Sequence, residues 1–214
     1  MLKGSINGQF YGDKTGATSA ITANAGELKL KASLSDITSS TVPSFSNLSF
    51  SVEKPGSFFI DYDVPKQDVR FQFMNSGRVL DKQLNLTYTH SIKENNCWMD
   101  GMLMIDSSNK LSANYKFDCG LSKLKYCYSQ GGGVRTFESC YAVADKSWDF
   151  AVSQRVCGND LVRASYQTSS KNLGLAWLTT SSFGGCFKVS ASVNLAEESK
   201  IPKLSAESTW DLDM

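Results

Sequence analysis

The sequence is short of the residues and segments that several classes of protein require. It has one histidine, His90, which removes most histidine-based catalysis and most mixed cysteine/histidine metal sites. Its 22 Lys+Arg and 21 Asp+Glu give a net charge of +1, without the basic excess of a dedicated nucleic-acid binder. No apolar run reaches the length of a transmembrane helix. We therefore expect no catalytic residues, no metal, no cofactor and no nucleic-acid partner.

Cysteine pairs at metal-ligand spacing are also missing. The six cysteines are Cys97, Cys119, Cys127, Cys140, Cys157 and Cys186. None forms a Cys-x-x-Cys pair, and their gaps match no zinc-ligand pattern. The first ten residues alternate in polarity instead of forming an apolar block, so we expect no secretory signal and a reducing compartment. Free thiols that act as small apolar side chains are the expectation, and a redox role is the alternative.

An alternation of apolar and polar residues is present along nearly the whole chain. Leu28, Leu30 and Leu34, for example, alternate with Lys29 and Lys31. Clear alternating runs cover residues 2–10, 28–34, 48–53, 69–73, 84–88, 111–117, 123–128, 148–153, 162–167, 187–193 and 203–212, and weaker ones cover 17–24, 58–63, 98–105, 134–143 and 173–178. This period of two indicates β-strands with two different faces, and no helical stripe competes with it.

Short turn signals separate these runs, among them Lys54-Pro55-Gly56, Asn75-Ser76-Gly77 and Gly158-Asn159-Asp160. No linker and no shift in composition divides the chain. The sequence therefore predicts a single all-β domain over residues 1–214.

Periodicity alone does not tell which face is buried, because a soluble barrel hides its apolar face and a membrane barrel turns it to lipid. The runs repeat about every 15 residues. A tilted strand needs ~9–11 residues to cross a bilayer, so this repeat is close to the length of one crossing strand plus a short turn. About 14 such strands would leave a wide apolar void in a soluble barrel. Aromatic residues also recur near run ends, as in an interfacial girdle. We predict a closed antiparallel transmembrane β-barrel of about 14 strands (range ~12–16). A soluble β-barrel or β-sandwich that carries an apolar ligand is the alternative.

The two faces of such a barrel have different predicted contacts. The residues expected to face lipid are Leu30, Phe71, Leu86, Tyr126, Val189 and Ala206. The residues expected to line the pore are Lys29, Lys31, Arg70, Lys116, Lys123, Lys125, Arg163, Lys188, Asp61 and Glu207. Cations outnumber acids on the polar positions, and a positive lumen favours phosphorylated and dicarboxylate solutes. The alternative is that these lysines only solvate the wall.

Several stretches also resemble a known family. They are VEKPGSFFIDYDVPK (Val52–Lys66), VRFQFMN (Val69–Asn75), LNLTYTH (Leu84–His90), ASYQTSSK (Ala164–Lys171) and SASVNLAEESKIPKLSAESTWDLDM (Ser190–Met214). They closely resemble the plastid outer envelope pore protein 24 family over essentially the whole length. The resemblance implies a homo-oligomeric, voltage-dependent and weakly cation-selective β-barrel channel in the outer envelope membrane of chloroplasts or etioplasts, without a cleaved transit peptide. It implies passive passage of triose phosphates, phosphate, dicarboxylates, sugars, sulfate, charged amino acids and nucleotides, and no catalytic residues.

Overall fold

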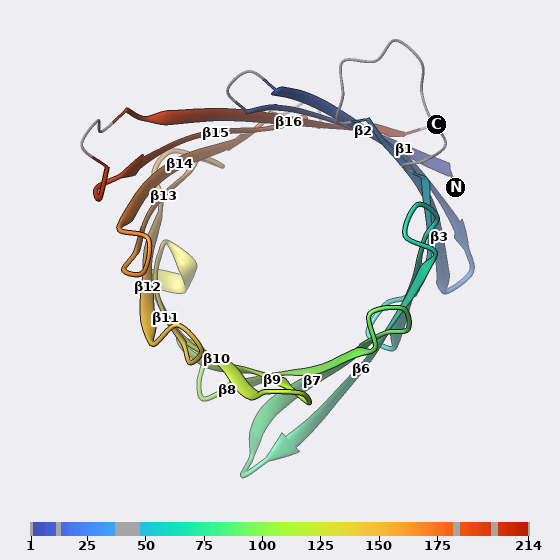
Figure 1. Ribbon diagram of the computed structural model, residues 1–214, viewed down its shortest axis with the longest axis horizontal. Helices are drawn as coiled ribbons and strands as arrows, with labels where there is room; N and C mark the ends of the chain where they lie inside the picture. Colours follow the sequence, from blue (N-terminus) through green and yellow to red (C-terminus); the bar gives the residue numbers. More distant parts are fainter. Residues whose placement is uncertain (1, 12–13, 37–47, 182–184, 198–200, 214) are drawn as a thin grey trace.

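The chain folds into a closed ring of sixteen antiparallel strands (Figure 1). The computed structural model describes residues 2–11, 14–36, 48–181, 185–197 and 201–213. The first eight strands are β1 (Leu2–Tyr11), β2 (Lys14–Ala25), β3 (Leu28–Asp36), β4 (Leu48–Lys54), β5 (Phe58–Asp63), β6 (Asp68–Val79), β7 (Lys82–Ser91) and β8 (Asn96–Met104). The others are β9 (Asn109–Lys116), β10 (Gly120–Gln130), β11 (Arg135–Ala142), β12 (Ser147–Arg155), β13 (Leu161–Gln167), β14 (Asn172–Thr180), β15 (Gly185–Asn194) and β16 (Lys203–Asp213).

One short 3-10 turn, η2 (Gly131–Gly133), connects β10 to β11. No helix in the described part of the chain has the length and apolar character to cross a bilayer.

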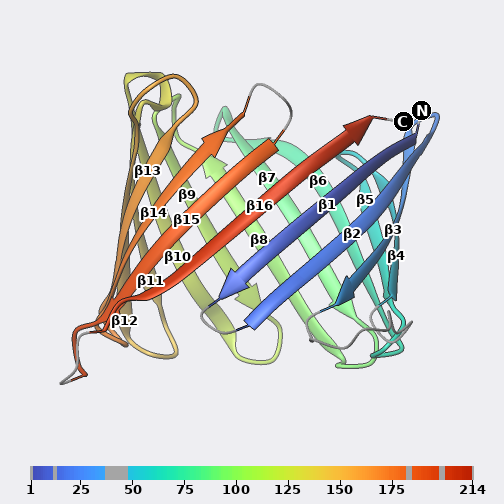
Figure 2. The ribbon, with the colours of Figure 1, turned by 90° about the horizontal axis from the view of Figure 1, so that it is seen from above.

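Each strand pairs with its neighbours in the sequence, and β1 closes the ring by pairing with β16. The closing register runs from Lys3 opposite Asp213 to Tyr11 opposite Ser205. Closure leaves no free sheet edge around the ring, which is the condition for a β-structure to exist in hydrocarbon. The strands are tilted, and the two chain ends lie next to each other at one end of the barrel (Figure 2).

The predicted fold class is confirmed, and the sixteen strands stand at the upper limit of the predicted range. Each alternating run of the sequence corresponds to one strand. The central prediction of about 14 was too low because several turns are short. Only two residues separate β2 from β3 and β6 from β7, so 214 residues in sixteen strands leave about 13 per strand and turn.

One predicted turn was wrong, because Asn75-Ser76-Gly77 lies inside β6. Pairing with β7 continues from Gly77 opposite Leu84 to Val79 opposite Lys82. The chain reverses at Leu80 and Asp81, whose φ angles are 49° and 61°. Positive φ at both central positions is the conformation that a two-residue hairpin prefers. The resulting hairpin leans outward from the ring, and Leu80 at its tip is 90% exposed (Figure 1).

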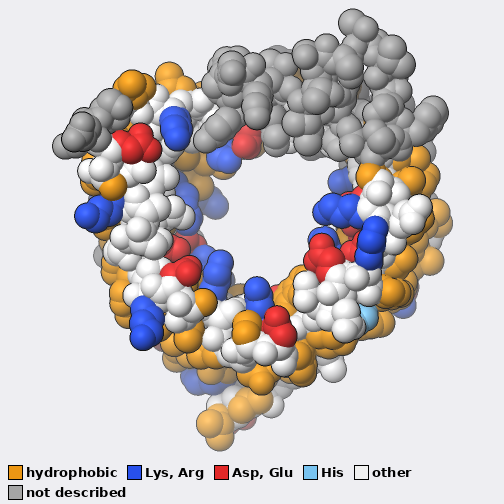
Figure 3. Space-filling model, in the orientation of Figure 1, with side chains coloured by type: hydrophobic (Ala, Val, Ile, Leu, Met, Phe, Trp, Pro, Cys, Tyr) orange, Lys and Arg blue, Asp and Glu red, His pale blue; other side chains and the backbone are white. Residues whose placement is uncertain are grey.

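Polarity is distributed opposite to that of a soluble barrel. In the space-filling view, Lys, Arg, Asp and Glu side chains surround the central opening, and hydrophobic side chains form the outer surface (Figure 3). Among the described side chains, Ala20 and Ala151 are the only buried hydrophobic ones. Large apolar side chains such as Ile21, Leu175 and Trp177 are instead more than half exposed. This arrangement suits a barrel surrounded by lipid, since lipid covers the apolar exterior that water would leave exposed.

Candidate functional site

The polar faces of the strands join into one continuous inner wall. Residues directly opposite each other on antiparallel strands point to the same side of the sheet. One row of such partners crosses seven adjacent strands: Thr22, Lys31, Ser51, Asp61, Arg70, Ser91 and Asn96. Because every member is polar, a solute that follows the wall meets hydrogen-bonding groups throughout this row.

The cross-strand register places all ten predicted pore-lining residues on this polar face. One group lies on β3, β5 and β6: Lys29, Lys31, Asp61 and Arg70. The other lies between β9 and β16: Lys116, Lys123, Lys125, Arg163, Lys188 and Glu207. The structure brings Asp61 opposite Arg70 and Lys188 opposite Glu207, while the two groups occupy different sectors of the ring. Contact of these residues with a passing solute stays a prediction.

Glu138 on β11 links two of the predicted cations. Its Oε1 lies 3.0 Å from Lys125 Nζ, and its Oε2 lies 2.5 Å from Arg163 Nη2. The side chain of Glu138 is 17% exposed, against 41% for Lys125 and 40% for Arg163. The carboxylate therefore sits deeper than its partners and neutralises part of their charge.

Other ion pairs on the wall are single. Lys188 Nζ lies 3.1 Å from Glu207 Oε2, and Lys29 Nζ lies 4.0 Å from Glu53 Oε1. Within the described residues, Lys31, Lys116 and Lys123 form no ion pair. Arg70 forms no ion pair in this part of the chain either, but Asp61 is its direct partner in the register. Among the described residues, these three lysines are therefore the predicted pore cations that have neither an ion pair nor a carboxylate directly opposite.

Sequence reasoning missed several carboxylates on this face. Asp63, Asp68, Asp100 and Glu138 all lie in register with polar wall residues. Asp100 accepts a hydrogen bond of 2.6 Å from the side-chain amide of Asn114. The alternation with exposed Phe137 could have placed Glu138 on the polar face, but residues 134–143 alternate too weakly for that assignment. The wall thus carries more negative charge than those predicted residues alone indicated.

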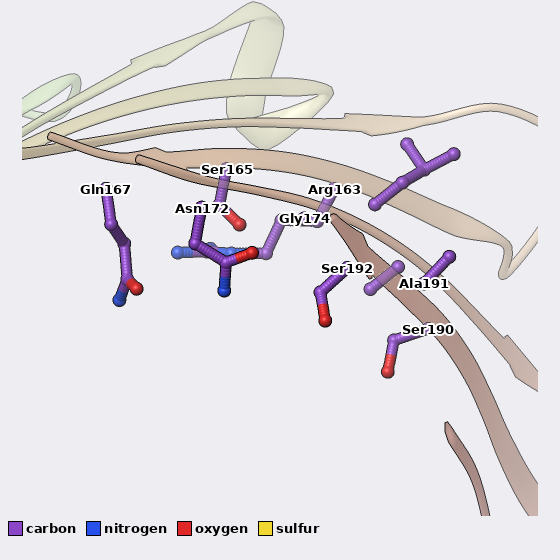
Figure 4. A pocket seen from close by; sticks show the side chains of 10 residues that line it. Arg163, Ser165, Gln167, Asn172, Gly174, Ser190, Ala191 and Ser192 are labelled. Carbon is purple, nitrogen blue, oxygen red and sulfur yellow. The ribbon is translucent and has the colours of Figure 1, made fainter. Parts of the chain in front are cut away.

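Two shallow polar hollows interrupt the wall between β10 and β15. One, of about 190 Å³, lies over β13, β14 and β15, where Ser165, Gln167, Asn172 and Ser192 point to the same side of the sheet (Figure 4). Its neighbour, of about 320 Å³, includes Lys125, Glu138, Asp149 and Arg163. Hydroxyl, amide and guanidinium groups in these hollows can donate hydrogen bonds to oxygen-rich solutes.

Gly174 keeps the first hollow open. A Cβ at this position would lie 2.8 Å from Ser165 Oγ on the adjacent strand. The position therefore needs glycine for space.

The six predicted lipid-facing residues lie on the opposite, apolar face. Leu30 is opposite Val52, Tyr126 is opposite Leu111, and Val189 is opposite both Trp177 and Ala206. Phe71 and Leu86 follow the same phase on β6 and β7. Their contact with acyl chains stays a prediction.

Aromatic side chains cluster on this outer face near both ends of the barrel. Tyr88 and Tyr115 each pack edge-on against Phe117, with centroids 6.2 and 5.5 Å apart. Phe187 and Trp210 make a similar contact of 5.3 Å near the end where the chain termini lie. Such rings, at the ends of strands, are typical of the two interfaces of a bilayer.

No group of three or more His, Cys, Asp and Glu side chains in the described part of the chain is placed to hold a metal ion. The six cysteines are free. The arrangement of polar side chains around an open passage is thus suited to contact solutes by charge and hydrogen bonds.

Solved structures with a similar fold include a porin and an outer membrane protein. A Rhodopseudomonas blastica porin variant superposes with a TM-score of 0.61 at 10% identity, covering 99% of both chains. The Acinetobacter baumannii outer membrane protein Omp33 superposes with a TM-score of 0.55 at 10% identity, covering 98% of this chain and 96% of that one. At this identity the likeness shows the barrel fold alone.

Sequence comparison extends over the whole chain. It is 52% identical over 213 residues to the chloroplastic outer envelope pore protein 24B of Arabidopsis thaliana, covering 100% of this chain and 99% of that protein. It is 41% identical over 224 residues to the chloroplastic outer envelope pore protein 24 of Oryza sativa subsp. indica, covering 100% of both. The family model of outer envelope pore protein 24 matches residues 2–213. Together with the porin-like ring and its polar inner wall, these matches confirm the predicted family: the chain belongs to the outer envelope pore protein 24 family.

Proposed function

We propose that this chain is a passive, voltage-dependent and weakly selective solute channel of the plastid outer envelope, acting as a homo-oligomer of single barrel domains spanning residues 1–214. Membership of the family and the porin-like barrel establish the coarser function, a channel of that membrane. The single observation that carries the proposal is the inverted polarity of a closed ring, apolar outside and polar inside. The solutes proposed are triose phosphates, phosphate, dicarboxylates, sugars, sulfate, charged amino acids and nucleotides.

Weak selectivity agrees with how charge is arranged on the wall. Lys125, Arg163 and Lys188 are each paired with a carboxylate, so the wall presents mixed charge instead of a ring of one sign. The Debye length at physiological salt is about 8 Å, so in a wide, wet passage each charge acts only on solutes that pass close to it. Solutes of either sign should therefore enter, with a modest bias set by the unpaired cations.

The proposed bias toward phosphorylated and dicarboxylate solutes depends on lysines of the wall. Lys31 and Lys123 form no ion pair among the described residues, whereas Lys29 and Lys125 are paired with Glu53 and Glu138. Replacing all four lysines by Gln removes four positive charges from the wall and leaves the two glutamates less compensated. The expected result is a shift of the reversal potential toward cations and a lower flux of phosphate esters, measured on refolded protein in planar bilayers under a salt gradient.

A matched control removes the same charge from outside the wall. Lys54, Lys82, Lys146 and Lys171 lie at strand ends or in turns, and their replacement by Gln should leave the reversal potential nearly unchanged. An equal shift in both variants would mean that net charge, not the wall, sets selectivity. An unchanged potential in the wall variant would contradict a pore-lining role for these lysines.

The alternative function, a soluble carrier of an apolar ligand, requires an apolar interior. The inner wall is polar, so the structure offers such a ligand no enclosed apolar site within its described residues. Resistance of the inserted protein to alkaline carbonate extraction is the expected outcome, and complete release would favour the carrier. Single-channel recordings under voltage ramps and mass measurement in detergent test the voltage dependence and the homo-oligomer.

A further inference from the structure

A histidine and a cysteine contact each other on the outer face of the β7–β8 hairpin. His90 and Cys97 are direct partners in the register, and His90 Nδ1 lies 2.7 Å from Cys97 Sγ. Tyr88, two residues before His90, donates its hydroxyl toward the same sulfur at 3.5 Å. His90 is the single histidine of the sequence and it contacts Cys97, so the other five cysteines have no histidine partner.

The pair lies at the rim of the barrel opposite the chain termini. Cys97 is the second residue of β8, directly after the β7–β8 turn, and its carbonyl accepts a 3.1 Å hydrogen bond from the Phe117 amide. On the inner side of the wall at this rim is a hollow of about 340 Å³, lined by Glu94, Asn96, Cys97, Trp98, Asn114, Lys116 and Asp118. The Cys97 side chain points to the outer face, but it is only half-buried and one residue from the turn, so a water-borne reagent can reach the sulfur at the aqueous edge of the barrel.

The other thiol at this rim has the opposite kind of partner. Cys119 lies in the β9–β10 turn, where a hydrogen bond with the Asp118 carboxylate raises the pKa of the thiol. It is more exposed than Cys97, which is half-buried. If exposure governed reactivity, Cys119 would react first; if the partner governs it, Cys97 reacts first.

We propose that Cys97 is a thiol modification site that reacts with small-molecule disulfides, with His90 accepting the thiol proton. The Cys97 sulfur attacks one sulfur of the disulfide, a new S–S bond to Cys97 forms, and the original S–S bond breaks. The departing thiolate takes the proton from the His90 imidazolium, so the disulfide is reduced to one thiol as Cys97 is oxidised. An external thiol reverses the step.

The test uses 5,5′-dithiobis(2-nitrobenzoate) as the disulfide probe on the full chain refolded in detergent. Three single-cysteine variants retain Cys97, Cys119 or Cys157, with the other cysteines replaced by Ser. An unassisted cysteine is only a few per cent thiolate at neutral pH, so the Cys97 variant should react about tenfold faster than the other two. His90→Gln in the Cys97 variant should lower its rate to theirs, and His90→Asn is the second variant should the first fail to refold.

Two results would overturn the proposal. One is an unchanged rate after substitution of His90. The other is a Cys97 that reacts only after the barrel is unfolded. A lack of channels before modification would instead contradict the proposed function, since the labelling rates need no conductance.

Discussion

An arginine placed on either side of the same strand tests which face of the barrel meets lipid. Val189 and Ser190 are neighbours in the middle of β15 (Gly185–Asn194), and they point to opposite faces. Val189 is 50% exposed and lies between Trp177 and Ala206. Ser190 lies opposite Ser205, with the two hydroxyl oxygens 2.6 Å apart. Val189→Arg and Ser190→Arg therefore add the same charge at the same height on different faces.

The expected costs differ for a physical reason. An arginine on the lipid face near the bilayer midplane destabilises a barrel by about 2–4 kcal/mol, because hydrocarbon must accept the charge. Ser190→Arg removes one hydrogen bond, worth about 0.5–1.5 kcal/mol, and its guanidinium stays in a wet passage. The difference of about 0.5–3.5 kcal/mol corresponds to roughly a 2- to 300-fold change in the unfolding equilibrium.

The assay is reversible urea unfolding from lipid vesicles, followed by tryptophan fluorescence. Leu30→Arg repeats the lipid-face test on another strand, where Leu30 lies opposite Val52. The reasoning would be refuted if Ser190→Arg cost as much as Val189→Arg or more. That outcome would mean that the polar face is packed and dry and that the apolar face meets water.

Three further predictions concern the inner wall and the outward-leaning hairpin. Gly174→Ala should lower the free energy of unfolding by about 1 kcal/mol, because a Cβ would lie 2.8 Å from Ser165 Oγ. Adding Ser165→Ala should restore the urea midpoint. An unchanged midpoint in Gly174→Ala would show that the two strands can move apart at no cost. Leu80→Asn with Asp81→Gly should raise the free energy of unfolding by about 1 kcal/mol in the same assay, because positive φ strains both native residues. An unchanged urea midpoint would argue against this strain. Glu138→Gln should shift the reversal potential toward anions, because Lys125 and Arg163 lose their carboxylate partner. An unchanged reversal potential would place these three side chains away from the solute path.

The strands were predictable because their signal is local. Alternation along each segment requires no knowledge of the partner strand, so even weakly alternating segments such as residues 134–143 coincide with a strand, β11. Turn residues were less informative. Asn75-Ser76-Gly77 has the composition of a turn, but the ladder to β7 continues through it and the reversal falls on Leu80 and Asp81. The turn propensity of three residues stabilises a turn less than the additional backbone hydrogen bonds of the β6–β7 pairing stabilise the strands.

A β-bulge shows another limit of periodicity. The register of β9 and β10 shifts between Leu121 and Lys123, which puts Leu121 and Leu124 on the same outer face although they are three residues apart. A strict period of two would assign them to opposite faces. The register after the bulge puts Lys123 and Lys125 on the polar face, in phase with the alternating run that begins there.

The sequence by itself determined that each segment is a strand with one apolar and one polar face, because both properties repeat within a few residues. It could not determine which side chains meet across strands, since register and closure depend on the whole ring. Only the tertiary structure placed Glu138 of β11 between Lys125 of β10 and Arg163 of β13. It also paired β1 with β16, which come from the two ends of the chain. The same closure turned the polar faces inward, because a ring of sixteen strands encloses more space than side chains can fill and only lipid can cover its apolar exterior.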